Sequence, residues 1–212
     1  MYSTVLQECN QSHATLVAVS KYRTMGEVMK LYDQGQRIFG ENRVQDLILK
    51  KKAFPKDIEW HLIGSLQKNK VKMIVGEVAL MHGIDDIELL QKVDEASHQK
   101  GCIQNVLLQI NISEEPQKHG FSLENFLENW EKIKGLDLRH VRIKGLMGMA
   151  VLTEDESLIK SQFVALKSLY DGINAKDGHC FEILSMGMSA DYPIALACGA
   201  THVRIGSKLF EE

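Results

Sequence analysis

Proline and paired cysteines are scarce in this sequence, and each shortage argues against a class of protein. Proline occurs three times in 212 residues, so no proline-rich linker divides the chain. The four cysteines form no Cys-x-x-Cys pair and no metal-ligand spacing, which argues against a disulfide scaffold or zinc module and favours thiols in a reducing compartment. We therefore expect one domain spanning residues 1–212 and a cytoplasmic location.

Long apolar runs and an excess of basic charge are also lacking. No run approaches the length that crosses a membrane, and the N-terminus lacks the regions of a signal peptide. The 25 Lys and Arg residues against 28 Asp and Glu give a net charge of −3, which does not suit a dedicated nucleic-acid binder. We interpret the run Lys50, Lys51 and Lys52 as the solvated end of a helix. We expect neither membrane nor nucleic-acid binding, and no metal site, since the eight histidines form no ligand motif.

Short apolar runs alternate with amphipathic stretches along almost the whole chain. Eight strands are predicted, at 16–20, 37–40, 59–63, 78–83, 106–112, 143–147, 181–185 and 203–205. Strands that alternate with helices indicate βαβ units and a parallel sheet. Eight of them in a chain of this length favour an α/β fold of the closed (β/α)8 barrel type, with an open doubly wound sheet as the alternative.

Three local patterns predict helix starts. Thr24 with Glu27, and Thr153 with Glu156, have the spacing of a capping box. Asn69 is the predicted cap of a further short helix.

Lys21 is the most informative residue, because it stands where the first predicted strand ends. Parallel α/β folds bind ligands beyond the carboxyl ends of their strands. A desolvated lysine amine at that edge is a nucleophile toward carbonyl groups. The alternative is a solvated lysine at a strand end.

Two loops near the end of the chain suit an anion. Residues 185–191 follow the seventh predicted strand, and Arg204, Gly206 and Ser207 end the eighth. Barrel enzymes frequently bind phosphate with the loops after strands seven and eight, through backbone N–H groups. The alternative is two ordinary strand-to-helix turns. An amine opposite a phosphate site suits pyridoxal 5′-phosphate or a sugar phosphate held by an aldolase, and the residues alone leave both open.

Ordered motifs add a resemblance that covers nearly the whole chain. They are LVAVSK at 16–21, FGEN at 39–42 with Val44 and Gln45, WHLIG at 60–64, LQKNK at 66–70, QINIS at 109–113 with Lys118 and Gly120, KGLM at 144–147, LSMGMS at 184–189 with Asp191, and VRIG at 203–206. With these motifs the sequence resembles the YggS/PROSC family of pyridoxal phosphate homeostasis proteins. The resemblance implies a barrel like the N-terminal domain of alanine racemase, of fold type III.

The resemblance also implies roles for individual residues. Lys21 would form the internal aldimine with pyridoxal phosphate, Asn42 would line the pocket, and Arg204 would face the cofactor at its phosphate or pyridine nitrogen. The residues implied to hold the phosphate are Ser185, Gly187, Met188, Ser189, Gly206 and Ser207. We expect His61 to be a core histidine satisfied internally, and Asp191 to cap or pair near the loop.

Racemases of related fold take a second proton-transfer group from an additional domain, for which this sequence leaves no room. We therefore expect a monomeric pyridoxal phosphate carrier without catalytic turnover, with pyridoxal phosphate-dependent apoenzymes as candidate recipients. An amino-acid racemase and a Schiff-base aldolase are the alternatives.

Overall fold

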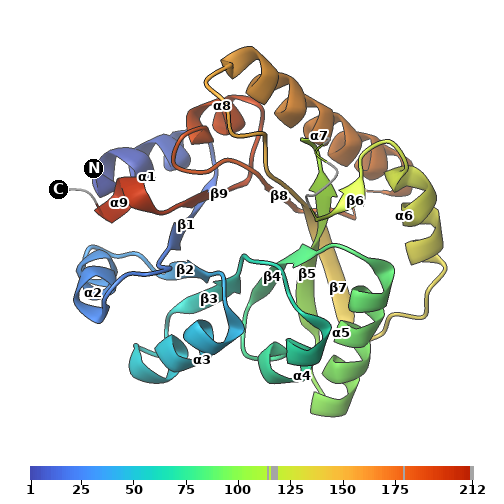
Figure 1. The fold of residues 1–212 in the computed structure, drawn as a ribbon, viewed down its shortest axis with the longest axis horizontal. Helices are drawn as coiled ribbons and strands as arrows, with labels where there is room; N and C mark the ends of the chain where they lie inside the picture. Colours follow the sequence, from blue (N-terminus) through green and yellow to red (C-terminus); the bar gives the residue numbers. More distant parts are fainter. Residues whose placement is uncertain (114, 116–118, 179, 211–212) are drawn as a thin grey trace.

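The chain closes into a parallel barrel surrounded by helices (Figure 1). The computed structural model describes residues 1–113, 115, 119–178 and 180–210, so Lys118 of the predicted resemblance lies outside the described residues. Pairing runs in the order β4-β3-β2-β1-β9-β8-β7-β5, and β4 also pairs with β5, which closes the ring. The predicted (β/α)8 barrel is therefore confirmed.

All eight predicted strands are present. The barrel strands are β1 Thr15–Val19, β2 Ile38–Glu41, β3 Glu59–Leu62, β4 Leu80–Ile84, β5 Gln104–Asn111, β7 Val141–Gly148, β8 Ile183–Ser185 and β9 His202–Ile205. One further strand, β6 Phe121–Ser122, pairs with the end of β5. Two residues are too short to give a period-2 pattern, so the sequence did not predict β6.

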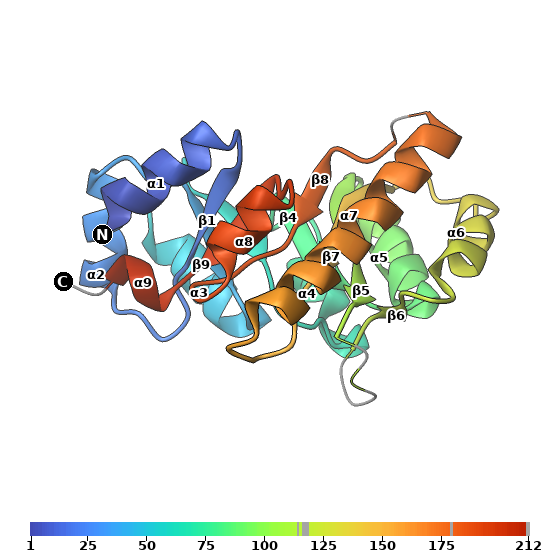
Figure 2. The same cartoon turned by 90° about the horizontal axis from the view of Figure 1, so that it is seen from above.

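Helices fill the connections and cover the outside of the barrel (Figures 1 and 2). They are α1 Tyr2–Gln11, α2 Met25–Asp33, α3 Val44–Ala53, η1 Lys68–Lys70, α4 Val71–Ile74, α5 Ile87–Lys100, α6 Phe126–Lys134, α7 Glu156–Asp177, α8 Tyr192–Ala197 and α9 Ser207–Phe210. Helix α7 packs against α8, and α1 packs against α9 close to where the chain ends.

Only one of the three predicted caps is correct. The Thr24 hydroxyl accepts a hydrogen bond from the Glu27 N–H, and the Glu27 carboxylate accepts one from the Thr24 N–H. The predicted cap at Asn69 is wrong, because this residue lies inside η1 and Lys70 precedes α4 without a side-chain cap.

The predicted capping box at Thr153 is also wrong, because α7 begins two residues later. Asp155 is the N-cap, and its Oδ1 accepts from the N–H groups of Ser157 at 2.9 Å and Leu158 at 3.1 Å. The Thr153 hydroxyl instead accepts from the Asp155 N–H. The aspartate prevails because a carboxylate is a stronger acceptor than a hydroxyl.

Side chains alternate along each strand between the helix layer and the barrel interior. On the outside, most buried apolar side chains join one continuous cluster. Inside, a small cluster of Leu80, Leu107 and Met147 lies beside Met149 and Ile183. The interior also holds the buried valines Val17 and Val19 and buried polar side chains such as His61, His82 and Arg204.

Candidate functional site

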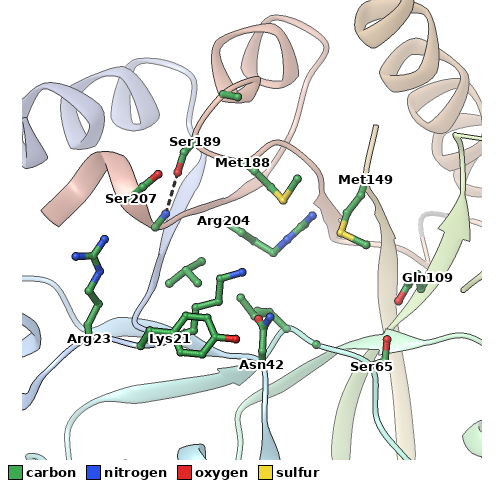
Figure 3. A pocket seen from close by; sticks show the side chains of 16 residues that line it. Lys21, Arg23, Asn42, Ser65, Gln109, Met149, Met188, Ser189, Arg204 and Ser207 are labelled. Carbon is green, nitrogen blue, oxygen red and sulfur yellow. Dashed lines mark hydrogen bonds between the residues drawn. The ribbon is translucent and has the colours of Figure 1, made fainter. Parts of the chain in front are cut away.

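A cavity of about 700 Å³ opens at the carboxyl ends of the barrel strands. Seven of the nine predicted site residues line it: Lys21, Asn42, Met188, Ser189, Arg204, Gly206 and Ser207. Figure 3 shows Lys21, Asn42 and Arg204 extending into the same space from different strands. Ser185 and Gly187 do not line the cavity.

Strand register explains why these residues meet. Val19 lines the cavity from the last position of β1, and Lys21 lies two residues further on the same face. In the same way Asn42 follows Gly40 of β2, and the cavity residue Ile63 lies two positions beyond the buried His61 of β3. The interior face of the barrel therefore continues past the strand ends and becomes the wall of the cavity.

The backbone just before Lys21 is held from two sides. The Ser20 N–H donates to the Gly40 carbonyl at 3.0 Å, and the Ser20 hydroxyl donates to Glu41 Oε1 at 2.7 Å. Lys50 donates to the Ser20 carbonyl at 2.6 Å and pairs with the buried Glu41. Lys50 is thus a structural anchor for this strand end, and our prediction of a solvated lysine there is wrong, because the adjacent buried carboxylate needs a cation.

Tyr22 turns the chain sharply after Lys21. Its φ is +62°, a left-handed conformation that few residues other than glycine adopt, and its side chain is 82% exposed while lining the cavity. The sequence carries no signal for this turn, because asparagine or glycine is the usual residue there.

The loop between β8 and α8 is tied to the end of β9. The Gly206 N–H donates to the Ser189 hydroxyl at 3.1 Å (Figure 3), and the Arg204 N–H donates to the Gly187 carbonyl at 3.0 Å. Gly187 has a φ of +92°, and a Cβ there would lie 2.5 Å from the Ala195 side chain, so a side chain does not fit.

Asp191 closes the same loop from inside. Its carboxylate accepts a hydrogen bond from the Met188 N–H at 2.6 Å. Asp191 therefore pairs near the loop, as expected from the sequence. Burial raises the pKa of Asp191, while the hydrogen bond from Met188 opposes that rise. The loop that presents Met188 and Ser189 to the cavity is therefore fixed by side chains from its own sequence.

Arg204 enters the cavity as a buried cation. Among the described residues, two acceptors hold its guanidinium: Ser185 Oγ at 2.6 Å from Nη1 and the Gly148 carbonyl at 3.2 Å from Nη2. Burial lowers the pKa of Arg204 to about 10, while the nearby Asp191 acts to raise it. The guanidinium is charged at neutral pH, and Ser185 lies behind it rather than on the cavity wall.

Other cavity residues were not predicted. Gln109 is buried at the end of β5, donates to the His119 carbonyl at 3.0 Å and lines the cavity together with Ser65 and Met149. The signal was present, because Gln109 follows the interior residue Leu107 by two positions and is a polar side chain that interrupts the apolar run from Val106 to Ile110.

His61 is buried with hydrogen-bond partners on both ring nitrogens, which confirms the expected core histidine. Within the described part of the chain, no group of three or more His, Cys, Asp or Glu side chains is arranged to hold a metal ion. The helices of this part are also too short or too polar to cross a membrane.

Comparison with known proteins places this cavity in a family. The family model for the N-terminal domain of alanine racemase matches residues 2–211. The pyridoxal phosphate homeostasis protein of Helicobacter pylori is 40% identical over 199 residues, which cover 93% of this chain and 87% of that protein. The protein chain belongs to the pyridoxal phosphate homeostasis family. The Escherichia coli K12 member is 33% identical and covers 98% of this chain and 90% of its own.

Solved structures agree with this assignment. PipY of Synechococcus elongatus PCC7942 matches over the full length of both chains at 30% identity, with a TM-score of 0.90 without pyridoxal phosphate and 0.87 for the structure with it bound. Alanine racemase of Clostridium difficile shares the fold alone, at 15% identity and a TM-score of 0.78, over 58% of its length. This chain thus shares the fold of part of the longer racemase.

Proposed function

We propose that this protein binds pyridoxal 5′-phosphate covalently on Lys21 and serves intracellular homeostasis of the cofactor, as a buffer or carrier. The observation that carries the proposal is one cavity that joins the Lys21 amine to the Ser189, Gly206 and Ser207 loop edge. Bound pyridoxal phosphate supplies an aldehyde for an amine and a phosphate for backbone donors. Support also comes from the relatives named for this role and from PipY, solved with pyridoxal phosphate.

Each cavity residue has a distinct part in the proposed site. Lys21 supplies the amine, and its exposed position leaves the amine accessible from solvent. The Ser189 and Ser207 hydroxyls bind the phosphate. Gly206 and Met188 form the wall around it, since their N–H groups already donate to Ser189 and Asp191. Asn42 forms the wall opposite this loop (Figure 3).

The remaining residues are Arg204, which lines the cavity, and two residues behind the cavity wall. Arg204 faces the cofactor ring, where a guanidinium keeps the ring nitrogen unprotonated and weakens the ring as an electron sink. Ser185 and Gly187, which we predicted at the phosphate, are assigned instead to positioning Arg204 and shaping the loop, because neither lines the cavity.

We further propose that turnover is not part of the function, that the chain acts as a monomeric single domain in the cytoplasm, and that apoenzymes dependent on pyridoxal phosphate receive the cofactor. A racemase needs proton-transfer groups on both faces of the substrate. The tyrosine nearest to Lys21, Tyr22, has a side chain that is 82% exposed, which suits access and release better than a closed active site.

The first test is an absorbance spectrum with added pyridoxal phosphate, followed by borohydride reduction and peptide mapping. We expect a visible adduct band and pyridoxyl mass on the Lys21 peptide, both absent in Lys21→Ala and retained in Lys30→Ala, which removes an exposed lysine of α2. An adduct that maps elsewhere, or no adduct, would contradict the proposed anchor. Release of α-deuterium from an amino acid far faster than with free cofactor would contradict the carrier role.

A further inference from the structure

A chain of side-chain hydrogen bonds crosses the barrel interior from the cavity to solvent. Arg204 Nη1 lies 2.6 Å from Ser185 Oγ, which lies 3.0 Å from His82 Nδ1. His82 Nε2 lies 3.0 Å from His61 Nδ1, and His61 Nε2 lies 2.9 Å from Glu59 Oε1. The four inner side chains belong to β9, β8, β4 and β3 and are at most 4% exposed, whereas the Glu59 side chain is 51% exposed.

Glu59, at the outer end of this series of hydrogen bonds, determines which atom of each ring carries the hydrogen. The hydrogen bond from His61 lowers the pKa of Glu59, so this carboxylate is ionised at neutral pH and only accepts. His61 therefore donates from Nε2. In its neutral form it must then accept at Nδ1 from the Nε2–H of His82.

The same assignment of donors and acceptors extends further into the barrel, to His82 and Ser185. Burial holds the pKa of His82 well below its usual range, so this ring is neutral and has one donor and one acceptor. With the hydrogen on Nε2, its Nδ1 accepts the hydrogen of the Ser185 hydroxyl. The lone pairs of Ser185 Oγ are then left for the Arg204 guanidinium.

The surroundings keep the rings of His82 and His202 neutral. His202 stacks on His61 with ring centres 6.3 Å apart, and burial lowers its pKa to about 4. The Arg204 charge and the other histidines act in the same direction on His82. Glu59, the acceptor at the end of the chain, is the anion hydrogen-bonded to His61.

We propose that His82 and His61 are positioning residues for Arg204. With Glu59 as the final acceptor, they direct each hydrogen of the chain away from the cavity. Ser185 is thereby kept as an acceptor that holds the guanidinium toward the cofactor ring. Only the effect on the cofactor rests on the proposed function, because the hydrogen positions belong to the protein alone.

The hydrogen positions can be measured without cofactor. Long-range ¹H–¹⁵N NMR spectra of the histidine rings report both tautomer and charge, and single variants assign the His61 and His82 signals. At neutral pH we expect each ring to carry its hydrogen on Nε2 and none on Nδ1. A hydrogen on His82 Nδ1, or a charged His61, would overturn the proposal whether or not the protein binds pyridoxal phosphate.

Two matched substitutions at His82 test the consequence for the site. His82→Asn places its amide oxygen near the position of Nδ1, so the Ser185 hydroxyl keeps an acceptor. His82→Gln places its amide group near the position of Nε2, so it reaches toward His61 and leaves the Ser185 hydroxyl without that acceptor. We expect Gln to shift the absorbance maximum of the Lys21 adduct and to weaken pyridoxal phosphate binding about tenfold, because the Ser185 hydroxyl loses its acceptor and no longer holds its lone pairs toward Arg204. The His82→Asn variant should keep the absorbance maximum and the affinity of the wild-type protein. Equal melting temperatures with unchanged adduct spectra in both variants would contradict the positioning role.

Glu59, at the solvent end of the hydrogen-bond series, allows the most specific control. Glu59 lies at the amino end of β3, outside the cavity, as does Glu182 directly before β8. We expect Glu59→Ala to shift the adduct spectrum and Glu182→Ala to leave it unchanged. Identical spectra for the two variants would refute transmission through the histidines. A wild-type protein that forms no adduct would refute the proposed function and leave the NMR test intact.

Discussion

The two faces of the barrel sheet differ in how many polar side chains they bury. The helix-facing layer is one continuous apolar cluster to which every barrel strand contributes. The interior has a small apolar cluster at Leu80, Leu107 and Met147, next to the buried and fully polar His82 and Arg204. Apolar burial is non-directional and tolerates many sequences, whereas each buried polar group needs a matched partner. The outer layer thus supplies most of the stability, and the inner layer specifies the site.

The largest expected effect breaks the outer layer alone. Phe163 is fully buried between α7 and the barrel, so Phe163→Ala should lower the free energy of unfolding by about 3–5 kcal/mol. Leu158→Ala, on the same helix but 43% exposed, should change it by less than about 0.5 kcal/mol. Urea unfolding measures both. If the layers are independent, the Lys21 adduct spectrum of folded Phe163→Ala will match wild type, and a shifted spectrum would show that they are coupled.

The next largest effect is the loss of stability at low pH that His202, in the barrel interior, causes. His202 has a pKa lowered to about 4 by burial, against about 6.5 in an unfolded chain. The unfolded state therefore binds more protons between these values, so stability is complete above pH 6.5 and falls as pH drops toward 4, by about 3 kcal/mol for this residue. His202→Gln should flatten the pH dependence of unfolding by that amount. Parallel curves for the two proteins would contradict a neutral His202 ring in the folded protein.

A smaller effect tests the loop that joins the layers. Gly187→Ala places a Cβ 2.5 Å from Ala195 at a φ of +92°, which should cost about 2 kcal/mol and weaken pyridoxal phosphate binding. Gly172 lies within α7 with nothing within 4 Å of an added Cβ. Gly172→Ala should therefore raise stability by about 0.5–1 kcal/mol and leave binding unchanged. Equal losses in both variants would mean that the cavity loop is not sterically constrained.

The contrast between layers also explains what the sequence could predict. Every barrel strand overlaps a predicted one, because the outer layer imposes apolar runs that are visible in a linear pattern. Lys21 and Arg204 were predicted because strand ends can be located along the sequence, and Asn42 was implied by the family resemblance. Partners across the barrel leave no such trace: Ser185 and His82 are 103 residues apart and meet only after closure. The hydrogen bond from Arg204 to the Ser185 hydroxyl likewise joins two strands and leaves no trace in the linear sequence.

The smallest expected effect concerns the start of α7, where the sequence pattern was ambiguous. Asp155 caps the helix through two N–H groups, so Asp155→Ala should lower stability by about 1 kcal/mol. Thr153→Ala removes only an acceptor outside the helix and should cost less than half as much. Thermal unfolding monitored by circular dichroism separates the two. A larger loss of stability in Thr153→Ala than in Asp155→Ala would support the capping box predicted from the spacing of Thr153 and Glu156. Because α7 belongs to the outer layer, neither substitution should move the Lys21 adduct spectrum, and a shift in either would extend the coupling between the layers to the helix ends.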